Sequence, residues 1–158
     1  MQILQMTQQD IQAVQQVATT SWHATYEGII PQHIQRNFLQ WAYSDEMLQK
    51  RLVETPFFVA KQAGEVIGFA NFSHNNELGE VELIAIYVDP TKQQQGTGTQ
   101  LLKVGLSLLQ PQKLFVNVEQ DNEIGKHFYI AKGFQVVEQF DEDFDGHILK
   151  TLRMVLVE

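Results

Sequence analysis

The sequence predicts an α/β domain built around one mixed, mostly antiparallel sheet that is flanked by helices. Helical and strand patterns alternate along the chain without a linker or an internal repeat. The 158 residues are enough to bury one hydrophobic core, and the chain has no cysteine for a disulfide or a zinc ribbon. We therefore expect a single domain over residues 1–158.

The first third of the chain predicts one strand followed by three helices. Residues 2–6 form a short apolar strand, and Thr7 caps a helix whose apolar residues recur with the 3.6-residue helical period. Pro31 suits the first turn of a second helix, and Ser44 caps a third.

The middle of the chain predicts three strands. Two apolar runs, 56–62 and 65–73, are joined across Ala63 and Gly64, which is typical of a hairpin. A third strand over residues 80–88 ends at an Asp-Pro turn. The remaining segments are a helix, a strand, a helix and two strands, over residues 96–110, 113–118, 122–132, 134–137 and 148–157.

Residues 88–102, VDPTKQQQGTGTQLL, place Gly96 and Gly98 between a strand and a helix. The first N–H groups of a helix have no intrahelical partner and carry the positive end of the dipole, so an anion can bind there. Glycines let that anion approach the backbone, and the preceding glutamines carry no charge. Thr97 and Thr99 add hydroxyl donors. The alternative is that the glycines only form a tight turn.

Two motifs together resemble those of the GNAT superfamily of N-acetyltransferases. The pattern Gln-x-x-Gly-x-Gly at residues 93–98 resembles the acetyl-CoA signature. Further on, Asn122, Tyr129, Gly133 and Phe134 occupy the places of a second signature, in which an Asn opens a helix that ends at Gly-Phe. The resemblance implies a GNAT fold with splayed central strands and an enzyme that uses acetyl-CoA as cosubstrate.

The resemblance also implies where acetyl-CoA binds. Free backbone groups of the strand before the glycine turn would pair with the pantetheine arm, and the amides of the turn would hold the pyrophosphate. Many relatives have Arg or Lys within the turn, whereas the nearest cations here are Lys92 and Lys103. The predicted cofactor-binding residues are Ile86, Tyr87, Val88, Gln93, Gln94, Gln95, Gly96, Thr97, Gly98, Thr99 and Asn122.

Acetyl transfer to nitrogen needs a group that removes a proton from the amine. A primary amine with a pKa of ~10.4 is mostly protonated at pH 7, and losing that proton costs roughly 4.6 kcal/mol. Glu82 shares a strand face with Ile84 and Ile86, where partial burial would suit it to accept a proton, and its position resembles that of the base in histone-type relatives. A water chain, or an exposed Glu82 with no role, is equally compatible with the sequence.

Tyr129 is the residue that the resemblance places to protonate the leaving thiolate. An ordinary phenol can donate to a thiolate at a cost of roughly 2 kcal/mol. We expect Ile124, Phe128 and Ala131 to form the apolar stripe of this helix and Tyr129 to lie on a neighbouring face. The alternative is a tyrosine that only packs.

The net charge of the chain indicates the class of acceptor. A formal net charge of -8 disfavours nucleic acid and suits a cationic partner. Trp22, Tyr26 and Glu27 lie where this family builds its substrate wall, and the acidic segment 140–147 lies near the acceptor cleft in such folds. The helices and this segment resemble bacterial spermidine/spermine acetyltransferases, while peptide N-termini and other small amines remain open.

Two other functions, calcium binding and acyl-CoA sensing, are alternatives to acetyl transfer. Asp141, Asp143 and Asp145 match the first half of a calcium loop, but Leu152 stands where a bidentate Glu is required. The five histidines show no metal spacing, so we expect no metal site. An acyl-CoA-binding sensor with the same fold is the other alternative. We expect a cytoplasmic location without a membrane segment, and the family resemblance leaves a homodimer open.

Overall fold

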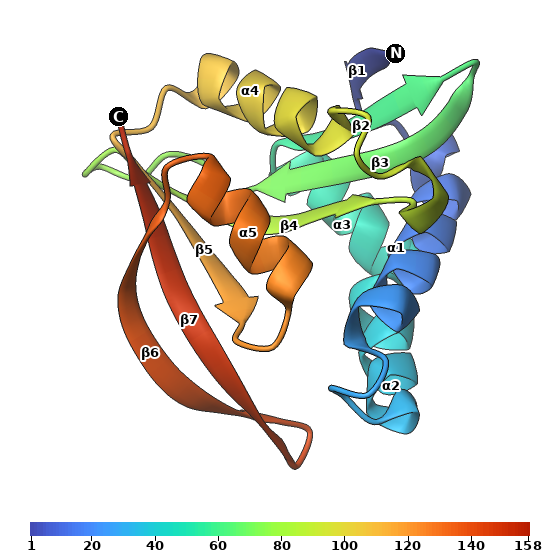
Figure 1. Ribbon diagram of the computed structural model, residues 1–158. Coiled ribbons are helices and arrows are strands. Elements are labelled where there is room, and N and C mark those ends of the chain that lie inside the picture. Colours follow the sequence, from blue (N-terminus) through green and yellow to red (C-terminus); the bar gives the residue numbers. More distant parts are fainter.

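The computed structural model describes residues 1–158 and has a single seven-stranded sheet with helices on both faces (Figure 1). The strand order is β1-β2-β3-β4-β5-β7-β6, and only β4 and β5 pair in parallel. This architecture confirms the predicted fold class. The strands are β1 Gln2–Gln5, β2 Phe57–Gln62, β3 Glu65–Phe72, β4 Glu80–Val88, β5 Lys113–Glu119, β6 Gln135–Phe144 and β7 His147–Val157.

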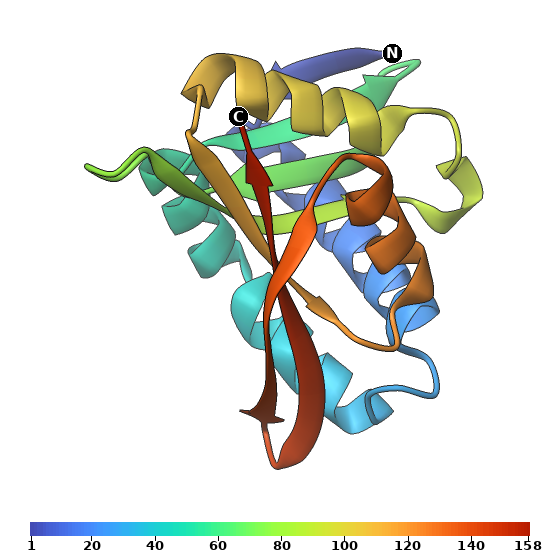
Figure 2. The ribbon, with the colours of Figure 1, turned by 60° about the vertical axis from the view of Figure 1, so that its left-hand side comes forward.

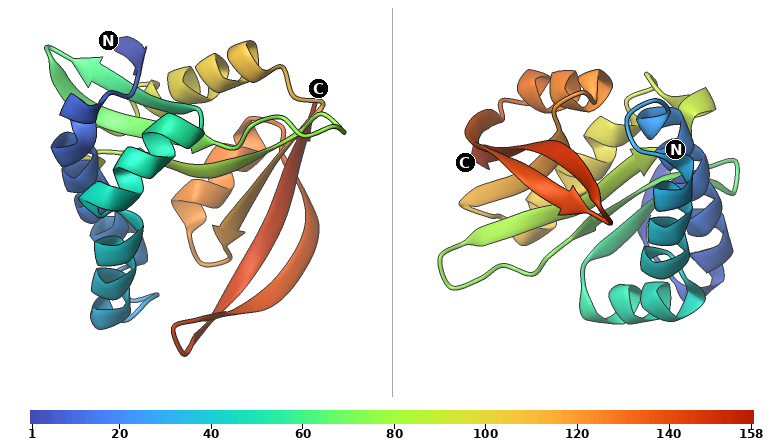
Figure 3. Two further views of the ribbon diagram at one scale, coloured as in Figure 1. Left: turned by 180° about the vertical axis from the view of Figure 1, so that it is seen from behind. Right: turned by 90° about the horizontal axis from the view of Figure 1, so that it is seen from below.

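Five helices cover the sheet in two groups. The first three lie together on one face, as seen from behind in Figure 3, and the other two lie on the opposite face. Each group closes its own core, so the sheet is buried on both sides. The helices are α1 Ile11–Tyr26, α2 Gln32–Ala42, α3 Asp45–Glu54, α4 Thr97–Leu109 and α5 Glu123–Ala131. No helix combines the length and apolar character that crossing a bilayer requires.

Short polar side chains begin several of these helices, as their sequences predict. The Ser44 hydroxyl accepts a hydrogen bond from the Met47 amide at 3.1 Å, and Asn122 Oδ1 accepts one from the Gly125 amide at 2.9 Å. Thr7 caps a short 3-10 turn, Gln8–Asp10, that leads into α1. These caps satisfy donors that a helix start otherwise leaves free.

The sheet opens at its centre. β4 pairs with β5 only at Glu80 to Lys113, Val81 to Leu114 and Glu82 to Phe115. Beyond Glu82, β4 stays with β3 while β5 follows β7, so the two strands diverge, as Figures 1 and 2 show. The splayed centre that the family resemblance implies is therefore present.

β4 contains a bulge just beyond its last contact with β5. Asn71 of β3 pairs with Ala85, whereas the next β3 residue, Phe72, pairs with Leu83, so Ile84 is an extra residue. The bulge resets the alternation of side chains. Leu83 and Ile86 both pack into the core under α4, while Ala85 packs into the core under α1.

The last two strands form a longer hairpin than the sequence predicts. β6 continues through the acidic residues to Phe144 and pairs with β7 along most of its length. Acidic residues disfavour strands, but pairing with β7 overrides that local preference. The hairpin tip packs on the first helices, because the Phe144 ring lies 5.4 Å from Phe38 and His147 Nε2 lies 3.0 Å from the Ile29 carbonyl oxygen.

Candidate active site

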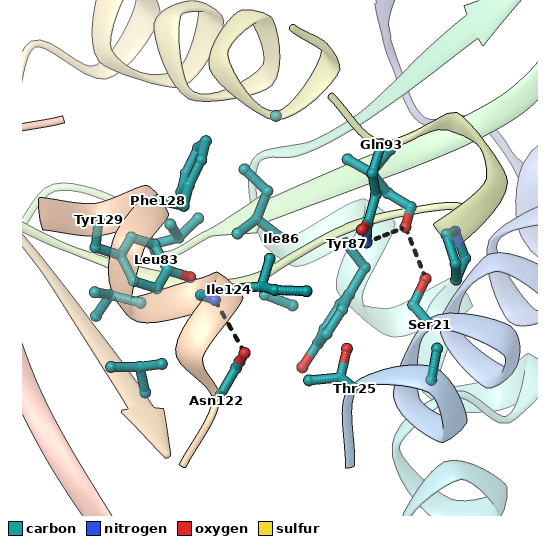
Figure 4. A pocket seen from close by; sticks show the side chains of 18 of the residues that line it. Ser21, Thr25, Leu83, Ile86, Tyr87, Gln93, Asn122, Ile124, Phe128 and Tyr129 are labelled. Atoms are coloured by element: carbon teal, nitrogen blue, oxygen red, sulfur yellow. Dashed lines mark hydrogen bonds between the residues drawn. The ribbon is translucent and has the colours of Figure 1, made fainter. Parts of the chain in front are cut away.

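A cavity of about 600 Å³ occupies the opening between β4 and β5 (Figure 4). Its walls come from the strands β4 and β5, from α1 on one face of the sheet, and from the glycine turn and α5 on the other face. A molecule bound there can therefore reach from the side of α4 and α5 to the side of α1. The wall residues from β4 are Leu83, Ile84, Ala85, Ile86, Tyr87 and Val88.

The glycine turn presents six backbone donors at one end of this cavity. Gly96 adopts a φ of 81° and begins α4, and Gln94 also has a positive φ of 67°. None of the amides of residues 94–99 donates a hydrogen bond within the protein. Successive free amides at a helix start form a site for an anion such as a diphosphate.

The two glycines are required for different reasons. At Gly96 a Cβ would meet nothing within 4 Å, so the positive φ is what favours glycine. At Gly98 a Cβ would lie 3.2 Å from the Phe128 ring, so this glycine lets α4 approach α5. The alternative of a tight turn thus explains part of the motif, while the free amides indicate an anion site.

Side chains of the turn contribute less than expected. The Thr97 hydroxyl is buried and donates to the Met1 sulfur at 3.3 Å, so it is not free for a ligand. Gln95 does not line the cavity, although Gln93, Gln94 and Thr99 do. No lysine or arginine lines it, which leaves the main chain as the source of donors at this end.

Two side chains contact the end of β4, where the strand leaves the cavity. The Val88 carbonyl oxygen accepts a hydrogen bond from the Ser21 hydroxyl at 3.1 Å and lies 3.5 Å from Gln93 Nε2. Ser21 therefore connects α1 to the end of the open strand. Among the predicted cofactor-binding residues of this strand, Ile86, Tyr87 and Val88, it is Val88 whose carbonyl oxygen is already hydrogen-bonded to a side chain.

Tyr129 lies in the cavity wall on α5, across from Tyr87 in Figure 4. It is 8% exposed and packs edge-on against Phe128 and Phe134, but its hydroxyl has no hydrogen-bond partner in the protein. Burial raises the pKa of Tyr129, and the neighbouring Tyr26 raises it further, so the phenol keeps its proton at neutral pH.

The expected apolar stripe of α5 is wrong for two of its three residues, since only Phe128 packs against the core. Tyr129 is the buried residue of this helix, whereas Ile124 is 73% exposed and Ala131 is also exposed. The helix lies beside the cavity and presents its hydroxyl-bearing residue inward. Asn122 also lines the cavity, but its side-chain oxygen already caps the helix, which leaves only its amide group to meet a ligand.

Glu82 does not line this cavity, in contrast to the expectation for a general base. The bulge at Ile84 places Glu82 and Ile86 on opposite faces of β4. The Glu82 carboxylate is 42% exposed and forms an ion pair with Arg153. It borders a separate, smaller cavity of about 230 Å³, together with His74 and Phe115.

Of the three predicted acceptor-binding residues, only Tyr26 lines the cavity. Trp22 is buried in an aromatic cluster, with ring centroids 4.5 Å from those of both Tyr26 and Phe38. Its Nε1 has no acceptor, so the indole does not present a face to an amine. Glu27 is exposed and lies outside the cavity wall.

The acidic hairpin does not form a calcium site. No group of three acidic or histidine side chains comes together in a way that could hold a metal ion. Asp143 accepts a hydrogen bond from the Gly146 amide at 2.8 Å, and Asp145 lies 3.4 Å from the Asn37 amide nitrogen. These carboxylates organise the turn and its contact with α2.

The end of the cavity near α1 contains groups that sequence reasoning missed. Tyr87 faces Tyr26, and burial raises the pKa of both tyrosines. Glu119, at the end of β5, is 7% exposed and does not line the cavity itself, but its charge also raises the pKa of Tyr26, which does. Its Oε2 accepts a hydrogen bond from the Asp121 amide at 2.5 Å. The only signal in the sequence is a charged residue that ends an apolar strand.

Comparisons with known proteins agree with this geometry. A model of the Acetyltransferase (GNAT) family matches residues 16–134. The uncharacterised N-acetyltransferase YuaI of Bacillus subtilis is 33% identical over 104 residues, which cover 64% of this chain and 60% of that protein. A spermidine N(1)-acetyltransferase of Thermoplasma acidophilum is 24% identical over 152 residues, 90% of this chain and 93% of that protein.

A solved structure shares the fold. The crystal structure of the PaiA N-acetyltransferase of Thermoplasma acidophilum, in complex with coenzyme A, superimposes with a TM-score of 0.87 at 24% identity, over 99% of this chain and 98% of that one. At this identity the likeness establishes the fold. Since the family model covers most of the chain, including the glycine turn and Tyr129, the protein belongs to the acetyltransferase (GNAT) family.

Proposed function

We propose that this protein is an N-acetyltransferase domain over residues 1–158 that moves an acetyl group from acetyl-CoA to a cationic primary amine. The observation that carries the proposal is the opening between β4 and β5, with free amides at one end and the Tyr129 hydroxyl in its wall. The coenzyme A bound by the Thermoplasma acidophilum protein of the same fold supports it.

Acetyl-CoA fits two parts of the cavity at which backbone groups have no partner in the protein. Amides of residues 94–99 would bind the diphosphate, and the open edge of β4 around Ile86 would pair with the amide groups of the pantetheine arm, as an added strand does. The amide group of Asn122 lines the same path. Since no cation lines the cavity, neutral main-chain donors carry most of the binding.

Tyr129 is the proposed proton donor to the departing sulfur. Its raised pKa makes a bare transfer costlier than the roughly 2 kcal/mol expected for phenol and thiol in water. Desolvation also raises the pKa of a thiol in the same site, which reduces the difference again. The Tyr129 hydroxyl has no hydrogen-bond partner in the protein, is not fully enclosed and borders the cavity, so it is available for that role.

A polyamine is the acceptor class that we favour. The chain carries a formal net charge of -8, and the hairpin near α2 has four exposed carboxylates, Asp141, Glu142, Asp143 and Asp145. Such a field attracts a polycation and raises its association rate. The Thermoplasma acidophilum relative that is named for spermidine supports the same class. Peptide N-termini and small monoamines are the competing acceptors.

The test is an acceptor screen with the purified protein and acetyl-CoA. We expect release of free CoA with spermidine and spermine, weaker release with lysine peptides and aminoglycosides, and mass-spectrometric detection of the acetylated amine. Retention of acetyl-CoA without release for any amine would instead support the acyl-CoA sensor. Failure to retain acetyl-CoA would contradict both functions.

A further inference from the structure

Glu119 is a buried carboxylate without a cationic partner. It is 7% exposed, and the protein forms three ion pairs, none of which includes it. Its hydrogen bond from the Asp121 amide engages one oxygen only, at 2.5 Å. The other oxygen accepts no hydrogen bond from any protein group and is not fully enclosed.

This arrangement is costly for the protein alone. A carboxylate has about four positions that accept hydrogen bonds, and buried charges are ordinarily paired or fully hydrogen-bonded. A buried charge that is left uncompensated destabilises the folded protein. A chain that keeps such a group has a deficit that a bound cation would remove, so the feature points to a positively charged ligand.

The position of Glu119 connects it to the cavity. Glu119 itself does not line the cavity, but side chains alternate along β5, so it shares a face with Asn117, which does. The neighbouring Val118 and Asp121 also line the cavity, so Glu119 lies directly beside its wall. Tyr26 lies across the gap on α1.

The arginine on this face of the sheet is not free to neutralise Glu119. Arg153 is the nearest arginine along the paired strands, but Glu82 and Asn117 already engage its guanidinium group, with an Asn117 Oδ1 to Nη1 distance of 2.9 Å. Thr151, which lies opposite Glu119 on β7, donates its hydroxyl to Glu142 instead.

We propose that Glu119 binds the ammonium group of the acceptor and takes its first proton, in the role that sequence reasoning gives to Glu82. The inference rests on the proposed function. The ammonium proton moves to the Glu119 carboxylate, and the neutral amine then forms a bond to the thioester carbonyl carbon. The carbon–sulfur bond breaks, the sulfur takes the Tyr129 proton, and the second proton from nitrogen restores the Tyr129 hydroxyl. Glu119 finally releases its proton to water.

The experiment compares Glu119→Gln with wild type on two acceptors, spermidine and the neutral aromatic amine aniline. The glutamine keeps an oxygen for the Asp121 amide but cannot take a proton. We expect kcat/KM for spermidine to fall by about a hundredfold or more, as loss of a general base does. We expect the rate with aniline, which needs no deprotonation, to stay within about threefold, because a merely structural defect would lower both rates.

Controls separate this inference from its competitors. In Glu119→Gln the melting temperature should equal or exceed that of wild type, because the uncompensated charge is gone, and the acetyl-CoA affinity should match wild type. The exposed Glu138→Gln on β6 should keep full activity. A loss for spermidine in Glu82→Gln, with Glu119→Gln unaffected, would overturn the assignment and restore Glu82. Equal losses for both acceptors in Glu119→Gln would also overturn it. A wild-type protein inactive on every amine would overturn the proposed function itself.

Discussion

The two ends of the central cavity present different kinds of groups. At the end near α4 the donors belong to the main chain, and they lie within one continuous segment, residues 94–99. At the end near α1 the wall is made of side chains from three elements, with Tyr26 on α1, Tyr87 on β4 and Asn117 on β5, and the buried Glu119 lies beside this wall. The first end depends on backbone conformation and the second on how distant segments meet.

The two ends also differ in charge. No lysine or arginine lines the α4 end, so an anion there meets only neutral dipoles. The α1 end contains tyrosines that burial keeps protonated, and a buried carboxylate lies beside it. An anion at one end and a cation at the other is the arrangement that an acetyl transfer from CoA to an ammonium group requires.

The largest expected effect tests the main-chain end. Gly96 and Gly64 have nearly equal φ values, 81° and 82°, and neither would bring a Cβ within 4 Å of another atom. Valine at either site should therefore cost similar stability, about 1 to 2 kcal/mol. We expect Gly96→Val to weaken acetyl-CoA binding by about a hundredfold in calorimetry, because it disturbs the free amides.

Gly64→Val is the matched control for that experiment, since Gly64 lies in the turn between β2 and β3, outside the cavity wall. It should bind acetyl-CoA as wild type does. Equal losses of affinity in both variants would mean that backbone strain alone, and not the anion site, explains the result.

A smaller effect is expected where the two ends meet, at Tyr129. We expect Tyr129→Phe to lower kcat by about tenfold or more with little change in acetyl-CoA affinity, because it removes the proton donor and keeps the ring packing. Stopped-flow and steady-state measurements of CoA release would detect the change. An unchanged kcat would remove Tyr129 from the mechanism and leave it as a packing residue.

The smallest effect is expected outside the cavity, at Glu82. Its carboxylate is 42% exposed and pairs with Arg153, and pairs of this kind contribute at most about 1 kcal/mol. We expect Glu82→Gln to change kcat by less than about twofold and to lower the free energy of unfolding by less than about 1 kcal/mol in urea titrations. A large loss of kcat would instead support Glu82 as the general base, as the sequence predicts.

Local patterns were sufficient wherever a property depends on neighbouring residues in the chain. The helix caps at Ser44 and Asn122 follow from short polar side chains, and the free amides of residues 94–99 follow from glycines at a helix start. The predicted order of helices and strands is the observed one. The family resemblance was needed to connect Tyr129 with that site.

Predictions failed where a second segment decides the outcome. The bulge in β4 depends on how β3 pairs with it, and it moved Glu82 out of the cavity. Trp22 was expected to meet an amine but is covered by Phe38 and by Phe144 from the hairpin tip. β6 extends through residues of low strand propensity because β7 supplies its hydrogen bonds.

The sequence by itself determined the α/β architecture, the helix starts and the turn at Gly96, since each depends on propensities and conformations within a few residues. Only the tertiary structure decided which carboxylate is buried without a cation and which hydroxyls line the cavity beside it. Burial and pairing are properties of contacts between distant segments, and one inserted residue in a strand is enough to exchange one face for the other.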